Sequence, residues 1–270
     1  MTDLQKKELE LLVQFVSVCE KLNITYYLVC GTALGAAKYQ GFIPWDDDMD
    51  VGIPREDYER FLREAPALLP EELFIQNYRT DPQFPHVFSK LRNSNTTYIE
   101  KETAHLKINH GIYIDIFPLD GYPAKKWEQC FFELRKKIYC WMQYCSLTGS
   151  PKRKVRIRNR IFRILGCHKR TAKTLARADR LYRRYPTKGS DIWCNHGNWQ
   201  GKLEYAPRWH YGQGTPGVFE GVAVQLPEKY DDYLTQKYKD WRADLPEDQK
   251  YGHHFYTVCD VNKPYTDYLG

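Results

Sequence analysis

Gly41-Phe-Ile-Pro-Trp-Asp-Asp-Asp-Met-Asp-Val-Gly-Ile-Pro54 is the segment of this chain that constrains the fold most. Apolar residues at Met49 and Val51 alternate with the acids at the end of the run. Alternate side chains of a β-strand point to the same face of the sheet. We therefore expect a strand that places Asp48 and Asp50 on one face, with Met49 and Val51 directed toward the core.

The acids of this segment suggest a metal site. Two close carboxylates repel each other unless a cation lies between them, and hard oxygen ligands are typical of Mg²⁺ or Mn²⁺ sites. Asp46 joins the pair if the strand begins early, whereas the alternation predicts that Asp47 points away. A third acid, Asp115, lies between isoleucines in another expected strand. The pattern predicts that Asp48, Asp50 and Asp115 hold one or two metal ions that act on a phosphoryl group.

Other interpretations of these acids stay open. A run of acids is often a solvated turn. The run also matches the first liganding positions of a calcium-binding loop, with Asp57 at the twelfth position. However, Val51 occupies the position that needs glycine in such a loop. Asp115 alone is compatible with a helix cap or a salt bridge.

The regions around the acidic segment alternate between helical and extended patterns. Helices are expected at residues 4–22, 33–39 and 55–64, and extended segments at residues 26–30, 73–78, 87–91 and 112–117. This alternation predicts an α/β or α+β fold with a mixed sheet flanked by helices. At the junction of the first strand and the second helix, the backbone N–H groups of Gly31 and Thr32 are placed to receive a phosphate.

The second half of the chain has a different pattern. Helices are expected at residues 125–145 and 151–185, followed by a strand at 222–226 and a helix at 228–241. We therefore divide the chain into a catalytic core in residues 1–122 and a mainly helical, basic region in residues 123–270 that completes the site. The two parts are expected to form one continuous domain, residues 1–270.

Residues 152–184 are unusually basic. Arginines follow one face of the expected helix and isoleucines another, and no acid occurs between residues 151 and 178. This pattern suits an anionic membrane surface. A solvated helix face explains it equally well. Nucleic acid is a third interpretation, but no RNA-binding motif is present, so we expect no nucleic-acid partner.

Composition narrows the class of protein. With 42% hydrophobic and 27% charged residues, the chain is typical of a globular protein rather than a disordered one. No stretch suits a transmembrane helix or a signal peptide, which predicts a cytoplasmic protein. The alternative is a protein attached peripherally to the inner face of the cell membrane. The eight cysteines include no CxxC pair and are expected to be reduced. Zinc ligands could be assembled only with irregular spacing, from Cys167-His168, Cys194/His196 and His253/His254/Cys259.

The acidic segment also carries a family resemblance. Tyr27-Leu-Val-Cys-Gly-Thr-Ala-Leu-Gly-Ala-Ala-Lys38 and residues 41–58 resemble the LicD family, whose signature the fukutin-related proteins share. Weaker likenesses lie at residues 90–97, 111–120 and 224–238, so the resemblance covers most of the chain. It implies a nucleotidyltransferase-like fold with its site at Gly31-Thr32, Asp48/Asp50 and Asp115.

The resemblance also implies an activity. LicD-like proteins are taken to move phosphocholine, or a related phospho-alcohol, from CDP-choline or a similar CDP-alcohol to a cell-surface glycan, such as a teichoic-acid or lipopolysaccharide precursor. Related members move ribitol phosphate. The expected partners are a CDP-alcohol donor and a glycan acceptor, free or lipid-linked, with Mg²⁺ or Mn²⁺ as cofactor. True nucleotidyl transfer to an alcohol or protein, and a non-catalytic glycan- or membrane-binding protein, remain the alternatives.

Several further residues are candidate contacts for the substrates. A base is expected at Asp115 or Asp46, and His110 is either an acceptor-side group or a structural histidine. Trp45 is the first candidate for an aromatic face against a choline cation. Basic side chains would stabilise the charge that builds on a leaving phosphate. The candidates for the donor's diphosphate are Lys38, Arg55, Lys90 and Arg92.

Overall fold

The computed structural model of the chain describes all residues except 146, 148–152, 198–200, 251, 253–254 and 269–270. A mixed sheet lies at its centre, with strand order β1-β2-β6-β4-β3 and two short strands that continue from β6. β2 and β6 are parallel, and the other neighbours are antiparallel. The sheet comprises β1 (Tyr27–Leu28), β2 (Asp50–Pro54), β3 (Leu73–Gln76), β4 (Ser89–Asn93), β6 (Ile112–Gly121), β7 (Ile192–Cys194) and β8 (Tyr205–Pro207). The expected mixed sheet is confirmed.

Three helices of the first half pack on this sheet. They are α1 (Asp3–Leu22), α2 (Cys30–Tyr39) and α3 (Arg55–Glu64). Thr2 caps α1 with a reciprocal bond to Gln5, and the apolar stripe of α1, including Leu12 and Phe15, is buried. The three expected helices are confirmed, although α2 begins three residues earlier than its pattern predicts.

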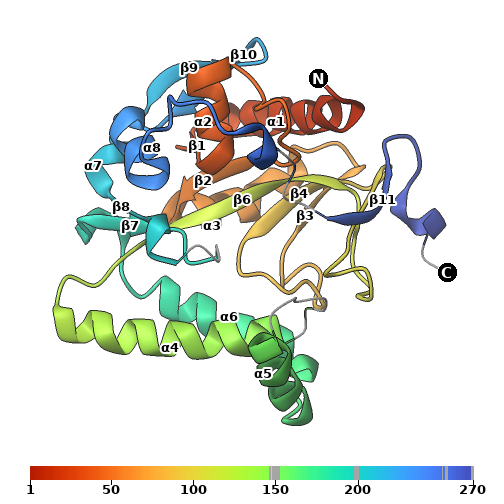
Figure 1. Cartoon of the computed structure of the whole chain (residues 1–270), viewed down its shortest axis with the longest axis vertical. Coiled ribbons are helices and arrows are strands. Elements are labelled where there is room, and N and C mark those ends of the chain that lie inside the picture. The colour runs from red at the N-terminus through yellow and green to blue at the C-terminus, as the bar shows by residue number, and fades with distance from the viewer. Residues whose placement is uncertain (146, 148–152, 198–200, 251, 253–254, 269–270) are drawn as a thin grey trace.

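Helices α4 (Lys126–Tyr144), α5 (Arg153–Ile164) and α6 (Thr171–Tyr182) occupy the segments 125–145 and 151–185, where helices were expected. Gly166, at φ +71°, separates α5 from α6. A second apolar core joins α4 to α6 through residues such as Phe132 and Leu175. The three helices lie together at one end of the molecule, away from α1 and α2 (Figure 1). None of the helices in the described part of the chain is long and apolar enough to cross a membrane.

The rest of the C-terminal half is not mainly helical, which corrects the expectation from sequence. It contains β9 (Thr215–Phe219), β10 (Val222–Leu226) and β11 (Tyr256–Asp260), with the short helices α7 (Arg208–Tyr211) and α8 (Tyr230–Tyr238). β11 pairs with β5 (Thr97–Glu100), a strand that the sequence pattern did not reveal. The 3₁₀ helices are Ala65–Ala67, Cys167–Arg170, Thr187–Gly189, Gly201–Glu204, Glu247–Gln249 and Tyr265–Tyr268.

β10 confirms the strand expected at residues 222–226, whereas β9, β7 and β8 were missed for local reasons. β9 and β10 form a hairpin whose two loop residues, Glu220 and Gly221, both have positive φ, as a type I′ turn requires. Asparagine or glycine usually marks the first of these positions, so Glu220 gave no turn signal. β7 and β8 have only three residues each and take their partners from β6 and from each other, which makes their pattern too short to recognise.

Candidate active site

A row of three ionisable side chains crosses the middle of the sheet. Asp50 on β2 lies opposite Asp115 on the parallel strand β6, and Asp115 lies opposite Lys90 on β4. Residues in register on adjacent strands share a face of the sheet, so the three side chains lie side by side. Asp50 and Asp115 are only 8% and 5% exposed. The Lys90 ammonium is 3.3 Å from Asp115 Oδ1, so the central acid of the row has a positive neighbour.

Lys90 is itself held by a buried polar network. Its Nζ donates to Glu100 Oε1 at 3.1 Å and lies 3.2 Å from the centroid of the Tyr113 ring. The Tyr113 hydroxyl donates to the same Glu100 oxygen at 3.0 Å, and burial raises the pKa of Tyr113 well above its usual range. Glu100 lies on the unrecognised strand β5, so sequence reasoning had no signal for its role.

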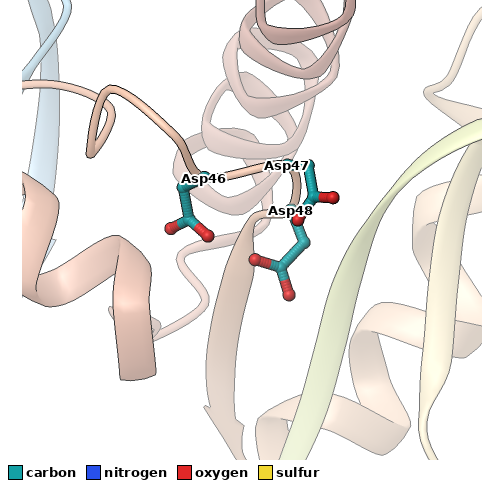
Figure 2. Close-up of side chains that lie close together, drawn as sticks. All are labelled: Asp46, Asp47 and Asp48. Carbon is teal, nitrogen blue, oxygen red and sulfur yellow. The ribbon is translucent and has the colours of Figure 1, made fainter. Parts of the chain in front are cut away.

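The acidic loop lies immediately before β2. The strand begins at Asp50, so residues 46–49 are not part of it and the two-residue alternation does not apply there. One carboxylate oxygen from each of Asp46, Asp47 and Asp48 lies within 4.8 Å of the others (Figure 2). The Asp47 side chain therefore lies with those of Asp46 and Asp48, whereas the alternation predicted that it points away from them. The backbone of the loop is fixed from α1, where Gln5 Nε2 donates to Asp46 O at 3.0 Å.

The N-terminus of α2 packs directly against the loop and β2. Thr32 Oγ1 accepts a hydrogen bond from the Asp50 backbone N–H at 2.7 Å. A Cβ atom added at Gly31 would lie 3.0 Å from Asp46 Oδ2, so glycine permits this close approach. The preceding residue, Cys30, has φ +53°, and its N–H donates to the Tyr233 hydroxyl of α8 at 3.1 Å. The structure thus brings the expected Gly-Thr turn beside the acids.

A buried ion pair lies next to Cys30, the residue before the Gly31-Thr32 pair. Lys237 of α8 donates to Glu204, and Glu204 also lies within reach of the Cys30 thiol. Both charged side chains are almost fully buried. Neither was expected to contribute to the site, because the pairing joins positions far apart in the sequence.

The other candidate residues are bonded away from the acids, although Arg92 shares Glu100 with Lys90. The Lys38 ammonium bonds the carbonyls of residues 242 and 243 and pairs with Asp244, and the Trp45 ring lies 5.4 Å below Lys250 Nζ. Arg92 is fully buried and donates to Gln76, Gly111 and Glu100. His110 is also fully buried, with its Nε2 3.1 Å from Leu106 O, and burial lowers its pKa. In this conformation neither Arg92 nor His110 reaches solvent.

The donor atoms suit a hard divalent cation. Asp46, Asp47 and Asp48 form the single group of at least three potential ligands that meets this distance limit among the described residues. Asp50 and Asp115 add buried carboxylates on the adjoining strands. All these ligand atoms are carboxylate oxygens, which fit Mg²⁺ or Mn²⁺. Of the alternative zinc ligands, Cys194 and His196 contact each other at 3.0 Å, whereas His253 and His254 lie outside the described residues.

Comparison with known proteins places this site in a family context. A model of the LicD/FKTN/FKRP nucleotidyltransferase domain matches residues 23–146, a span that contains the Gly-Thr turn, the acidic loop and the Asp50–Asp115–Lys90 row. Lipopolysaccharide cholinephosphotransferase LicD from Haemophilus influenzae is 27% identical over 257 residues, which cover 91% of this chain and 92% of that protein. Human ribitol 5-phosphate transferase FKRP is 48% identical over 42 residues, covering 16% of this chain and 8% of that protein.

The two kinds of match agree with the geometry of the site. One relative aligns over almost the whole chain, and the family model covers residues 23–146, which carry the acids. Residues 23–146 therefore carry a LicD/FKTN/FKRP nucleotidyltransferase domain, and the chain is similar over almost its whole length to a LicD cholinephosphotransferase.

Proposed function

We propose that the protein transfers phosphocholine, or a related phospho-alcohol, from a CDP-alcohol to a hydroxyl group of a cell-surface glycan or its teichoic-acid or lipopolysaccharide precursor. The observation that carries the proposal is the pairing of Asp50 with Asp115 on neighbouring strands, next to the acidic loop. The names of the relatives, a cholinephosphotransferase and a ribitol 5-phosphate transferase, support a phospho-alcohol as the transferred group.

The proposed reaction is a displacement at the phosphorus atom distal to cytidine. The acceptor oxygen forms the new bond to that phosphorus, the bond to the bridging oxygen breaks, and its electron pair leaves with cytidine monophosphate. The acceptor's proton passes to a carboxylate, for which Asp115 or Asp46 is the candidate. Asp48, Asp50 and Asp115, with Asp46, would hold Mg²⁺ or Mn²⁺, which supplies neutralisation of the diphosphate charge.

The remaining residues of the site position the donor. The first N–H groups of α2, at Gly31 and Thr32, lie beside the acids and offer hydrogen bonds to a phosphate. Lys90 adds a fixed positive charge next to Asp115. Because such reactions depend mainly on positioning and charge neutralisation, a rigid row of this kind is well suited to them.

Donor binding is expected to depend on the metal. We predict that CDP-choline raises the melting temperature only when Mg²⁺ or Mn²⁺ is present, because the carboxylates repel the bare diphosphate. At a free donor concentration of about one hundred times Kd, linkage gives about 2.7 kcal/mol of stabilisation, which is a shift of several degrees. A thermal-shift titration with and without EDTA measures it. Equal stabilisation in EDTA would contradict a metal bridge between these acids and the donor.

A doubly labelled donor distinguishes the proposed reaction from nucleotidyl transfer. With one label in choline and another in cytidine, the proposal requires choline on the acceptor and cytidine in free cytidine monophosphate. Cytidine on the acceptor would instead establish nucleotidyl transfer. The absence of any metal-dependent release of cytidine monophosphate, with donor binding intact, would favour a binding protein.

A further inference from the structure

A row of large apolar side chains is exposed along α4. Trp127 and Phe131 are 61% and 63% exposed, and Leu134 and Ile138 continue the row at helical spacing. The opposite face of α4 is the one that packs, since Phe132 lies in the core between α4 and α6. The exposed row is therefore not the face by which α4 packs on the protein core.

Helix α5 presents a second apolar row. None of its residues is buried, and Ile157, Ile161 and Ile164 are all more than half exposed, Ile164 by 77%. Its contacts with α4 include two hydrogen bonds, from Asn159 Nδ2 to Tyr144 O and from Arg163 Nε to Cys145 O, each at 3.0 Å. α5 thus packs beside the C-terminal end of α4 without burying its own isoleucines (Figure 1).

Positive charge surrounds both apolar rows. α5 reads RKVRIRNRIFRI and contains no acid, and Arg153, Arg156 and Arg160 are exposed. On α4, Arg135 and Lys137 are exposed next to the apolar row. An apolar face bordered by arginines and lysines is the pattern of a helix that lies in the interface of a lipid bilayer. Long basic side chains reach the headgroups while apolar ones enter the acyl region.

We propose that this α4–α5 surface, formed by residues 127–138 and 153–165, binds the surface of an anionic lipid bilayer. A second copy of the chain fits less well, because a two-fold contact would bring the basic α5 helices against each other. Nucleic acid would match the charge but leave the apolar rows uncovered. The surface requires an occupant that is apolar and negatively charged together, and a bilayer with anionic headgroups satisfies both conditions.

Vesicle sedimentation with the full chain tests the proposal. We expect the protein to sediment with phosphatidylcholine vesicles that contain phosphatidylglycerol, to sediment little with phosphatidylcholine alone, and to be partly released by high salt. Replacing Arg153, Arg156 and Arg160 by glutamine should weaken binding about fivefold per residue, and so about a hundredfold in total. Phe131→Ser/Leu134→Ser should also weaken binding, at low and high salt alike.

Matched variants make the result interpretable. Val13→Ser/Leu245→Ser changes two exposed apolar residues outside the α4–α5 surface and should bind vesicles like the unchanged protein. All these variants should release cytidine monophosphate from a water-soluble donor at the unchanged rate, so that failure of the membrane proposal is separable from failure of the proposed reaction. Equal binding to neutral and anionic vesicles, or undiminished binding by Phe131→Ser/Leu134→Ser, would overturn the proposal. So would a dimer in solution that this serine variant converts to a monomer.

Discussion

Asp50→Asn and Asp115→Asn should each reduce turnover roughly a hundredfold to a thousandfold while the protein remains folded. Asparagine keeps the size of the side chain and one oxygen atom, but it removes the charge that would hold a cation. The two carboxylates lie side by side on β2 and β6 and are almost fully buried, so the sheet fixes their positions. Steady-state assays of cytidine monophosphate release measure the effect.

The melting temperature of the variant distinguishes a loss of metal binding from unfolding of the protein. Removing one of two neighbouring carboxylates relieves their repulsion, so the metal-free melting temperature of Asp50→Asn should hold or rise slightly. Asp48→Asn, in the loop before the strand, is expected to lose most of its turnover as well. Asp240→Asn is the matched control, because this exposed acid lies far along the chain from the site.

Asp47→Asn tests how the loop acids share their role. The Asp47 carboxylate lies with those of Asp46 and Asp48, but it also lies against Gly252, where an added Cβ would be 2.6 Å from Asp47 Oδ2. We therefore expect a smaller loss of activity than for Asp48→Asn. Wild-type turnover in all the Asp variants would show that the acids are structural and that the active site lies elsewhere.

Much of the fold could be predicted because its elements carry local patterns. The 3–4 spacing of Leu12, Phe15 and Cys19 announces α1, and α3 follows Pro54, whose fixed φ suits the start of a helix. Asp115 between two isoleucines identified a buried strand with a polar side chain. In each case one short segment contains both the apolar periodicity and the polar or proline residue that interrupts it.

The parts that were missed depend on pairings across long stretches of chain. Whether Lys90 faces Asp115 is decided by the register of β4 on β6, which no local pattern reveals. Glu100 became a partner of Lys90 through a strand that pairs with residues near the C-terminus. Gln5 reaches the acidic loop from 41 positions away. The short strands β7 and β8 are likewise stabilised by their neighbours rather than by their own sequence.

Arg55 shows why charge alone is a weak guide to function. The sequence made it a candidate for the donor's diphosphate, since a positive group would stabilise the charge on the leaving phosphate. In the structure it is buried. Its Nε donates to Asp120 Oδ1 and its Nη2 to Asp120 Oδ2, both at 2.7 Å. Its Nη1 donates to Asp179 Oδ1 at 3.0 Å. These partners are 65 and 124 positions away in the chain. The guanidinium therefore links the start of α3 to β6 and α6.

Arg55→Met is accordingly expected to destabilise the protein by about 3–5 kcal/mol, because it leaves the fully buried Asp120 without its ion-pair partner. Denaturant unfolding measures this change. Arg63→Met, at the exposed end of the same helix, is the control and should cost less than about 1 kcal/mol. Arg55→Met/Asp120→Leu should recover part of the loss, since it removes the unpaired charge as well.

The pH dependence of the Arg55→Met loss identifies its cause. Burial raises the pKa of Asp120 even beside Arg55, which lowers it, so loss of the guanidinium should raise the folded-state pKa of Asp120 further. A group of this kind contributes its stability below the unfolded pKa and loses it as the pH rises through the folded pKa. The difference in unfolding free energy between Arg55→Met and the unchanged protein should therefore widen from pH 4 to pH 7. A difference that is constant over this range would mean that lost packing of the arginine stem, rather than an unpaired Asp120 carboxylate, destabilises the variant.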